Sequence, residues 1–434
     1  MKTLRFKGGI HPEGHKELTK SKEIVKVKPP QEVYIPLSQH TGAPSKPLVK
    51  KKDKVKVGTR LSEPNGFVSV PIHSPVSGIV DGIVNVYHCS GRKVEAVKII
   101  TEGEELEEGV GVERDISSLK KEELIEKIKM SGIVGLGGAA FPTHVKLSPP
   151  PDKKIDTVII NGAECEPYLT ADHRIMLEKK KEIFGGIEVI RKILNPEKVI
   201  IGIEDNKIDA YENLVKYKDK DVEIALLRTW YPQGGEKQLI YALTGRVVPA
   251  GGLPFDVGCY VQNVGTVVAI YEALRFGKPL YERVITITGG VEERGNYLVP
   301  IGTPVKYLLE IVKPKGNIGK IILGGPMTGI SIISDEVPVI KGTSGIIVQL
   351  EKEVFTDEQY PCIRCSSCVD TCPMSLMPTE LEKLVGNGKY EEAEKMGIMF
   401  CIECGCCSYV CPSRRPLVHS IKVGKREILK RRKK

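Results

Sequence analysis

Short apolar runs alternate with helical patterns through the middle of the chain. Residues 155–161, 199–204 and 222–228 are apolar runs of strand length, and apolar positions recur at helical spacing over 172–184, 236–244 and 261–276. Strands that alternate with helices are typical of a parallel sheet covered by helices. We therefore predict an α/β domain over residues 115–278, with its ligands beyond the carboxyl ends of the strands.

The part before this domain has a different pattern. From residue 33 to residue 101, short β-like runs are broken by Gly, Pro and Asn, which predicts a small β-sandwich over residues 33–105 after an N-terminal segment, 1–32. Residues 73–80 resemble a strand and turn of lipoyl and biotinyl carrier domains. Those carriers hold their prosthetic group on a lysine in an exposed hairpin. No such hairpin is evident here, so we interpret the sandwich as structural.

A glycine-rich stretch follows a predicted helix. Ser118 is placed to cap a helix that ends at Met130, and Gly135, Gly137 and Gly138 come next. A Rossmann fingerprint follows a strand, so this loop is not the entry to an ordinary dinucleotide fold. Glycines leave a backbone that can lie against a phosphate or a flat ring.

The cysteines supply the most specific pattern in the chain. Two runs read C-x2-C-x2-C-x3-C-P, and they consist of Cys362, Cys365, Cys368 and Cys372, then Cys401, Cys404, Cys407 and Cys411. This spacing is typical of ferredoxins with two 4Fe-4S clusters, in which the fourth cysteine of each run binds the other cluster. We therefore predict one cluster on Cys362, Cys365, Cys368 and Cys411. The second takes Cys401, Cys404, Cys407 and Cys372, all within a domain of residues 355–415.

Disulfides and zinc are the alternatives for these cysteines. The chain shows no secretory signal, and zinc sites use paired C-x2-C elements rather than triplets closed by Cys-Pro. We interpret Cys406 as a spare thiol. With Cys89, Cys165 and Cys259 it is too scattered to form a disulfide framework, which favours a reducing cytoplasm.

Charge is concentrated at the two ends of the 434-residue chain. The formal net charge is +9, and residues 412–434 hold ten Lys or Arg against Glu427 alone. We expect residues 416–434 to form a basic tail with unpaired charges, either solvated or docked on a lipid surface or a protein partner. No stretch approaches the ~20 apolar residues of a membrane span.

Several of these loops together resemble known electron-transfer proteins. The glycine loop, the loops that begin at Asn161 and Tyr231, and residues 262–264 resemble the flavin and NADH site of the flavoprotein subunit of respiratory complex I. The whole order, from residues 6–12 to the paired cysteine runs, resembles the C subunit of the Rnf electron-transport complex. The resemblance implies a Rossmann-like flavin and NADH-binding domain over residues 115–278 and a β-grasp ligand-binding domain over residues 280–352.

The same resemblance implies a set of site residues. FMN would contact Gly135, Gly137, Gly138, Lys146, Asn161, Glu164, Tyr231, Glu236 and Asn263, and the nicotinamide nucleotide would contact Phe141, Lys146 and Glu166. Lys146 and Glu166 are the candidate catalytic residues. The chain departs from the complex I pattern at Ala163, where that pattern has Asp, and at Gly235, where it has Glu.

These parts predict an oxidoreductase subunit. NAD(H) exchanges a hydride with FMN, and two 4Fe-4S clusters carry single electrons to or from partners. By resemblance, the partners are membrane subunits of an Rnf-type complex that couples transfer to ion movement on the cytoplasmic side of the membrane, with ferredoxin reached through another subunit. The alternatives are a soluble cobalamin reductase of the related family and a nucleic-acid or scaffold protein with structural clusters. Few aromatics and no recognisable nucleic-acid module stand against the last.

Overall fold

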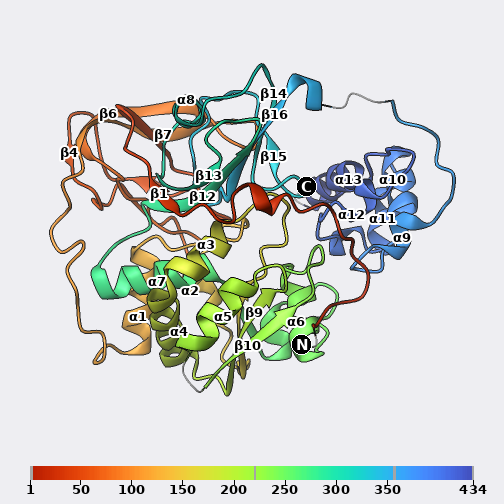
Figure 1. The fold of residues 1–434 in the computed structure, drawn as a ribbon, viewed down its shortest axis with the longest axis horizontal. Coiled ribbons are helices and arrows are strands. Elements are labelled where there is room, and N and C mark those ends of the chain that lie inside the picture. The colour runs from red at the N-terminus through yellow and green to blue at the C-terminus, as the bar shows by residue number, and fades with distance from the viewer. Residues whose placement is uncertain (1–2, 219–220, 355–357, 433–434) are drawn as a thin grey trace.

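The elements form three groups in space in the computed structural model, which describes residues 3–218, 221–354 and 358–432 (Figure 1). Strands of the first hundred residues and of residues 282–350 occupy the upper part of the view. An α/β layer lies below them, and the C-terminal helices form a separate group beside both. The candidate chemistry lies where these parts meet.

The α/β layer contains a four-stranded parallel sheet in the order β10-β9-β8-β11. Its strands are β8 (Thr157–Gly162), β9 (Lys198–Glu204), β10 (Val222–Leu227) and β11 (Cys259–Asn263). The helices of the layer are α1 (Lys121–Met130), α2 (Thr143–Lys146), α3 (Ala171–Glu178), α4 (Lys180–Leu194), α5 (Ile208–Tyr217), α6 (Glu236–Thr244) and α7 (Val264–Phe276). The three predicted strands are confirmed. A long apolar core that includes Val158, Ile187 and Val267 fills the space between sheet and helices.

Two predicted helices differ from the structure. Residues 261–263 belong to strand β11, because they pair with β8, and the Asn263 side chain then caps α7 by accepting the Thr266 N–H at 3.2 Å. The segment 172–184 is divided at Lys179, whose φ of −121° lies outside the helical region. The segment therefore forms two helices, α3 and α4.

Helix α1 begins two residues later than the predicted cap allows. Lys120 is the capping position, and its backbone N–H donates to the Glu123 carboxylate at 2.7 Å. A carboxylate near a helix N-terminus also interacts favourably with the helix dipole. Ser118 is therefore not the cap.

The N-terminal strands form an antiparallel sheet and a small two-stranded ladder. The strands are β2 (Glu32–Pro36), β3 (Lys46–Pro47), β4 (Lys54–Val55), β5 (Ser62–Glu63), β6 (Ser77–Tyr87) and β7 (Lys93–Gly103), in the orders β2-β7-β6-β4 and β3-β5. Val33, Leu61 and Ile99 are fully buried in their shared core. The alternation of buried and exposed positions fits a β-sandwich with one face in water.

A six-stranded mixed sheet follows the α/β layer in the chain. Its order is β1-β13-β12-β16-β14-β15, with strands β1 (Ile24–Lys26), β12 (Glu282–Gly289), β13 (Gly295–Pro300), β14 (Ile318–Leu323), β15 (Ile330–Ser331) and β16 (Gly345–Leu350), and helix α8 (Val305–Val312). Leu308 and Val312 of α8 pack into its core. Strand β1 comes from the N-terminal segment, where no sequence pattern predicted a strand.

The C-terminal part consists of short helices that follow cysteine-rich turns. They are α9 (Ser367–Asp370), α10 (Pro378–Gly386), α11 (Tyr390–Lys395), α12 (Cys406–Tyr409) and α13 (Leu417–Arg431). Four short 3-10 turns complete the secondary structure of the described residues, at Lys16–Leu18, Pro254–Val257, Glu351–Glu353 and Ile398–Phe400. No described helix is both long enough and apolar enough to cross a bilayer.

Helix α13 replaces most of the basic tail expected over residues 416–434. Ile421 and Ile428 are buried in a core shared with Leu381 of α10. The charges are not all unpaired as expected, since Lys425 lies 2.6 Å from Glu403. The helix is thus part of the folded C-terminal region, while residues 433–434 lie outside the described residues.

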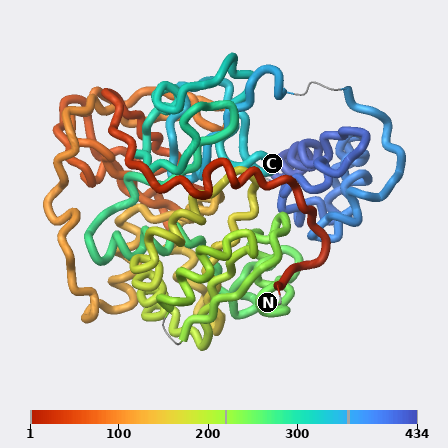
Figure 2. Tube along the Cα trace, viewed as in Figure 1, coloured from red at the N-terminus to blue at the C-terminus, as the bar shows by residue number. Residues whose placement is uncertain are grey.

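The N-terminal segment passes along all these parts, as the red trace in Figure 2 shows. Leu4 pairs with Leu227 of the α/β sheet, and Ile10 pairs with Tyr231. Between them, the Gly9 N–H donates to the Thr371 carbonyl at 2.9 Å in the C-terminal region. The segment therefore links the α/β layer to the cysteine turns before it joins the mixed sheet through β1.

We expect Gly424→Leu to destabilise the C-terminal region, because a Cβ at this position would lie 2.4 Å from Val385 Cγ2 and 2.8 Å from Ile398 Cδ1. Overpacking of this kind costs roughly 1–3 kcal/mol. Gly386→Ala is the matched control, since its Cβ would meet no heavy atom within 4 Å. Thermal unfolding should show a lower midpoint for the first variant only. Equal midpoints would contradict the packing of α13 on α10.

Candidate functional site

The glycine loop lies against the N-terminal end of α7, beyond the carboxyl end of β11. The Leu136 N–H donates to Thr266 Oγ1 at 2.8 Å, and a Cβ on Gly137 would lie 3.4 Å from Asn263 Cβ. Other parts of the chain also hold the loop: Arg283 of the mixed sheet donates to the Leu136 carbonyl at 3.1 Å, and Thr41 of the sandwich donates to the Ala139 carbonyl at 3.0 Å. Three parts of the chain thus fix one loop.

Gly138 leaves one side of this loop open. Its φ is +109°, and a Cβ built on it would meet no heavy atom within 4 Å. Residues 137–139 are exposed. A backbone without side chains that faces open space suits close approach by a phosphate or a ring.

Lys146, at the end of α2, is the charged residue nearest after the loop in the chain. Its ammonium group lies 2.7 Å from Glu236 Oε1, donates to the Val261 carbonyl at 2.6 Å, and sits 5.7 Å from the ring centre of Tyr260. The Lys146 side chain is 25% exposed and that of Glu236 is 39% exposed, so solvent or a ligand can reach the pair. Phe141 is partly buried, and its carbonyl accepts the Gly135 N–H at 2.9 Å.

Amide and carboxyl side chains occupy the strand ends beside the loop. Asn161, at the end of β8, donates to the Gly234 carbonyl at 2.9 Å, and Asn263 donates to Asp172 Oδ2 at 2.7 Å. Burial, with Glu164 nearby, raises the pKa of Asp172 to about 7. Glu164 itself accepts the N–H groups of Asp172 and His173, at 2.7 and 3.2 Å, so its carboxylate caps α3.

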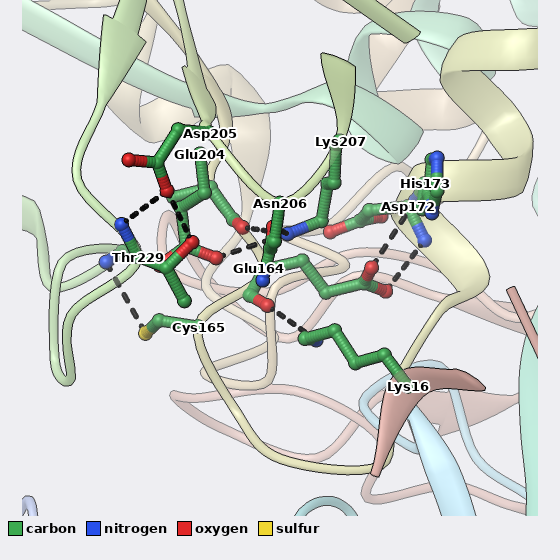
Figure 3. Close-up of polar contacts among 12 residues, drawn as sticks. Lys16, Glu164, Cys165, Asp172, His173, Glu204, Asp205, Asn206, Lys207 and Thr229 are labelled. Carbon is green, nitrogen blue, oxygen red and sulfur yellow. Dashed lines mark hydrogen bonds and ion pairs between the residues drawn. The ribbon is translucent and has the colours of Figure 1, made fainter. Parts of the chain in front are cut away.

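Two lysine ammonium groups hold the loop that follows β8 (Figure 3). Lys16 donates to the carbonyls of Glu164, Glu166 and Leu169 at 2.8, 3.0 and 2.6 Å. Lys207 donates to the Ala163 carbonyl at 2.7 Å and lies 2.9 Å from Glu204. Burial, with the charge of Lys207 nearby, lowers the pKa of Lys16. The loop therefore depends on two ammonium groups for its carbonyl partners.

Glu166 and Tyr231 form a second group, which faces the C-terminal region. The Tyr231 hydroxyl donates to the Cys404 carbonyl at 2.7 Å and lies 3.5 Å from Glu166 Oε1. Glu166 accepts the N–H groups of Met327 and Thr328 at 3.1 and 2.9 Å. Burial raises the pKa of Glu166. These two predicted site residues thus join the α/β layer to the cysteines.

The two cysteine runs have matching backbone shapes. Arg364 and Glu403 both have φ of 58°, and each N–H donates at 3.4 Å to the sulfur of the cysteine two residues earlier. Each run continues into a four-residue helix, α9 or α12. N–H groups aimed at sulfur are typical of iron–sulfur turns, where such bonds adjust the reduction potential.

A cavity between the runs combines cysteines from both. It is lined by Cys372 of the first run and by Cys401, Cys404 and Cys407 of the second, among apolar side chains that include Leu376 and Ile421. Burial raises the pKa of Cys401 to about 11 and that of Cys407 to about 12. Cys411 of the second run packs in a separate cluster with Cys368 of the first run, together with Cys407 and Leu417. Cys372 therefore lies with the second run, and Cys411 lies near a cysteine of the first.

Cys406 also lines this cavity, although it falls outside the ligand spacing of its run. It is buried, and its sulfur lies 3.9 Å from the Tyr231 carbonyl. Among the described residues, no group of three or more His, Cys, Asp or Glu side chains converges on a position for a single metal ion.

Sequence reasoning missed several residues of the site. Lys16 and Lys207 look like two of many lysines, and Met327 and Thr328 lie 161 and 162 residues from Glu166. The available pattern was Gly-Gly-Pro at residues 324–326, a turn signal after an apolar run. It predicts a loop but not its partner.

Three family models match successive parts of the chain. One described as RnfC barrel sandwich hybrid domain matches residues 4–104, one described as Nuo51 FMN-binding domain matches 128–272, and one described as 4Fe-4S dicluster domain matches 354–412. The NAD+-reducing [NiFe]-hydrogenase in its H2-reduced state is a solved structure with partial likeness: TM-score 0.49, 19% identity, 71% of this chain and 62% of that one. This likeness is too weak to place residues.

Curated relatives match over most of their length. The C subunit of the proton-translocating ferredoxin:NAD(+) oxidoreductase complex of Clostridium ljungdahlii is 46% identical over 90% of this chain and 86% of its own. The C subunit of the Na(+)-translocating ferredoxin:NAD(+) oxidoreductase complex of Acetobacterium woodii is 44% identical over 99% and 98%. The C subunit of the ion-translocating oxidoreductase complex of Rhodobacter capsulatus is 39% identical over 99% and 84%.

We expect Lys207→Met to destabilise the protein strongly, because it leaves the Glu204 carboxylate buried and unpaired; the two side chains are 0% and 1% exposed. Breaking such a pair typically costs about 3–5 kcal/mol, and the double variant with Glu204→Leu should recover part of this. Lys154→Met, in an exposed pair with Glu197, is the control and should leave the midpoint nearly unchanged. Denaturant unfolding measures all three. A Lys207→Met midpoint equal to that of the control would show that the pair is not structural.

Proposed function

Because this chain belongs to the Rnf family, as the C subunit of an ion-translocating oxidoreductase complex, we infer that it transfers electrons between NAD(H) and iron–sulfur clusters by way of FMN. Family membership sets aside the cobalamin-reductase alternative. The observation that carries the inference is the 2.7 Å bond from Tyr231, in a loop of the FMN-binding domain, to the carbonyl of Cys404. This bond brings the FMN-binding domain into contact with one of the cysteine turns that would hold a cluster.

The FMN site is proposed to lie on the open side of the glycine loop. Gly138 leaves room there for a ring or a phosphate, and Lys146, at the end of the helix that follows the loop, offers a cation. Asn161 and Asn263 present side-chain amides from adjacent strands, each oriented by the partner it donates to. When bound, FMN supplies the exchange between a two-electron hydride and single electrons.

The nicotinamide nucleotide is proposed to reach Phe141 and Lys146, which border the same exposed loop. Glu166 has a different role in this proposal from the one the resemblance implied. Its carboxylate already accepts hydrogen bonds from Met327 and Thr328. We assign it to positioning the loop of the mixed sheet rather than to contact with nicotinamide.

The cluster ligands are proposed to be exchanged between the two runs. Cys372, Cys401, Cys404 and Cys407 would hold one cluster, supported by the cavity that all four line. Cys362, Cys365, Cys368 and Cys411 would hold the other, supported by the packing of Cys411 in one cluster of side chains with Cys368, Cys407 and Leu417. The matching turns give each set N–H groups directed at sulfur.

Partners are proposed to be the other subunits of an Rnf-type complex, with this chain peripheral on the cytoplasmic side of the membrane and ferredoxin reached through another subunit. Finer domain limits are also proposed: sandwich 33–105, FMN and NADH domain 115–278, β-grasp 280–352 and cluster domain 355–415. The strand order of the mixed sheet, with an antiparallel pair β12 and β13 followed by α8, supports the β-grasp assignment.

Anaerobically reconstituted protein is expected to hold about eight irons per chain, from two clusters of four. Iron and flavin analysis with an absorbance spectrum measures this. A chain that takes up zinc and no iron would overturn the cluster assignment.

Gly138→Val is expected to empty the FMN site while both clusters remain, because the new side chain would occupy the open side of the loop. Gly91→Val is the matched control: Gly91 also has a positive φ, +78°, and open space around its Cβ, but it lies in the β6–β7 hairpin. NADH should then no longer bleach the clusters of Gly138→Val, although dithionite still should. Cys365→Ala should do the converse, damaging one cluster while NADH still reduces the flavin. Retained flavin in Gly138→Val would mean that the loop is only a turn.

A further inference from the structure

The two proposed cluster sites differ in their contacts with the rest of the chain. Several contacts join the site of Cys372 and Cys404 to other parts of the chain. Tyr231 donates to the Cys404 carbonyl at 2.7 Å, Gln238 lies 3.4 Å from the sulfur of Met374, and a Cβ on Gly405 would lie 3.0 Å from the Met327 carbonyl. A further contact comes from the N-terminal segment, through a short stretch that we call the strap.

The strap consists of Gly8 and Gly9. The Gly8 carbonyl accepts the indole N–H of Trp230 at 2.7 Å, and the Gly9 N–H donates to the Thr371 carbonyl at 2.9 Å. Both glycines have positive φ, and a Cβ on Gly8 would lie 3.1 Å from the Cys372 carbonyl. Only residues without side chains fit between the Trp230 loop and the cysteine turn.

The other site faces outward. Cys365 is exposed, and Tyr360 and Ile363 beside it are 55% and 68% exposed. The Tyr360 N–H donates to Ser413 within the C-terminal region at 3.1 Å. The described residues around this site therefore make their contacts within the C-terminal region, and the side chains of Tyr360, Ile363 and Cys365 are open to solvent.

We propose that Tyr231 is a positioning residue that holds the cluster of Cys372, Cys401, Cys404 and Cys407 against the flavin domain. In this arrangement, that cluster exchanges electrons with the flavin site. The Cys362 cluster exchanges electrons with partners. The proposal rests on the proposed function. Tyr231 was expected to contact FMN, but its hydroxyl is committed to the Cys404 carbonyl. The Tyr231 hydroxyl donates to a carbonyl of the cluster loop rather than to a sulfur, so it acts on the cluster as a nearby dipole, and its positive end favours the more negative, reduced cluster.

Tyr231→Phe tests this role because it removes one hydroxyl and keeps the ring. In reconstituted full-length protein, the variant should keep wild-type flavin and iron contents. The reduction potential of one cluster should fall. At a fixed applied potential, its oxidised-to-reduced ratio should change about fivefold, which is the size expected for one hydrogen bond. A fivefold change corresponds to a shift of about 40 mV in the potential of a one-electron couple. Anaerobic redox titration followed by electron paramagnetic resonance measures it.

Two further variants identify the clusters and control for the substitution, and a third tests the strap. Cys365→Ser removes the signal of the outward cluster and so assigns the remaining signal. Tyr360→Phe makes the same change beside the outward cluster and should move neither potential. Trp230→Phe, which removes the donor to Gly8, should slow NADH-driven reduction of the same cluster that Tyr231→Phe affects.

The outcomes separate this proposal from the function on which it rests. If NADH fails to bleach the flavin of the wild-type chain, the proposed function itself fails. If NADH reduces flavin and clusters in the wild type but Tyr231→Phe leaves both potentials unchanged, or shifts only the Cys362 cluster, the role of Tyr231 and the cluster order are overturned.

Discussion

The loop that follows β8 keeps its shape because two lysine ammonium groups bind its carbonyl oxygens. Lys16 binds three carbonyls of the loop, and Lys207 binds a fourth together with a buried carboxylate. Buried carbonyl groups without partners are costly, so the loop could not hold this course alone. As a result, the Glu164 side chain caps α3, and the Glu166 side chain lies near the Tyr231 hydroxyl that donates to Cys404.

From this loop the site divides into two halves. Asn161 and the Glu164 cap on α3 belong to the half around Gly138, where the backbone is open. The Glu166 carboxylate belongs to the other half, where it lies 3.5 Å from the Tyr231 hydroxyl and accepts the Met327 N–H. One short segment thus organises the space suited to a flavin and the boundary with the cluster region, which is the arrangement an adaptor between hydride and single electrons requires.

Features that depend on residues close together in the chain were predictable from the sequence. The strands β8, β9 and β10 are short apolar runs buried in a parallel sheet, and cysteine spacing predicted two alike turns. Contacts between distant residues were not predictable: the Tyr231 hydroxyl and the Cys404 carbonyl are 173 positions apart. The many Lys and Arg residues of α13 predict a basic tail. Its apolar positions are nevertheless spaced as the buried face of a helix, at Leu417, Ile421, Gly424 and Ile428. Strand β1 has three residues and no buried position, so periodicity could not reveal it.

The most direct test of the central claim is the electron capacity of the reconstituted chain, measured by anaerobic coulometric titration with the absorbance spectrum recorded throughout. A flavin that takes two electrons and two clusters that take one each predict about four electrons per chain, with flavin and cluster bands both bleaching. A capacity of about two electrons with no flavin bleaching would contradict the account, because the chain would then hold clusters without the adaptor that joins them to NAD(H).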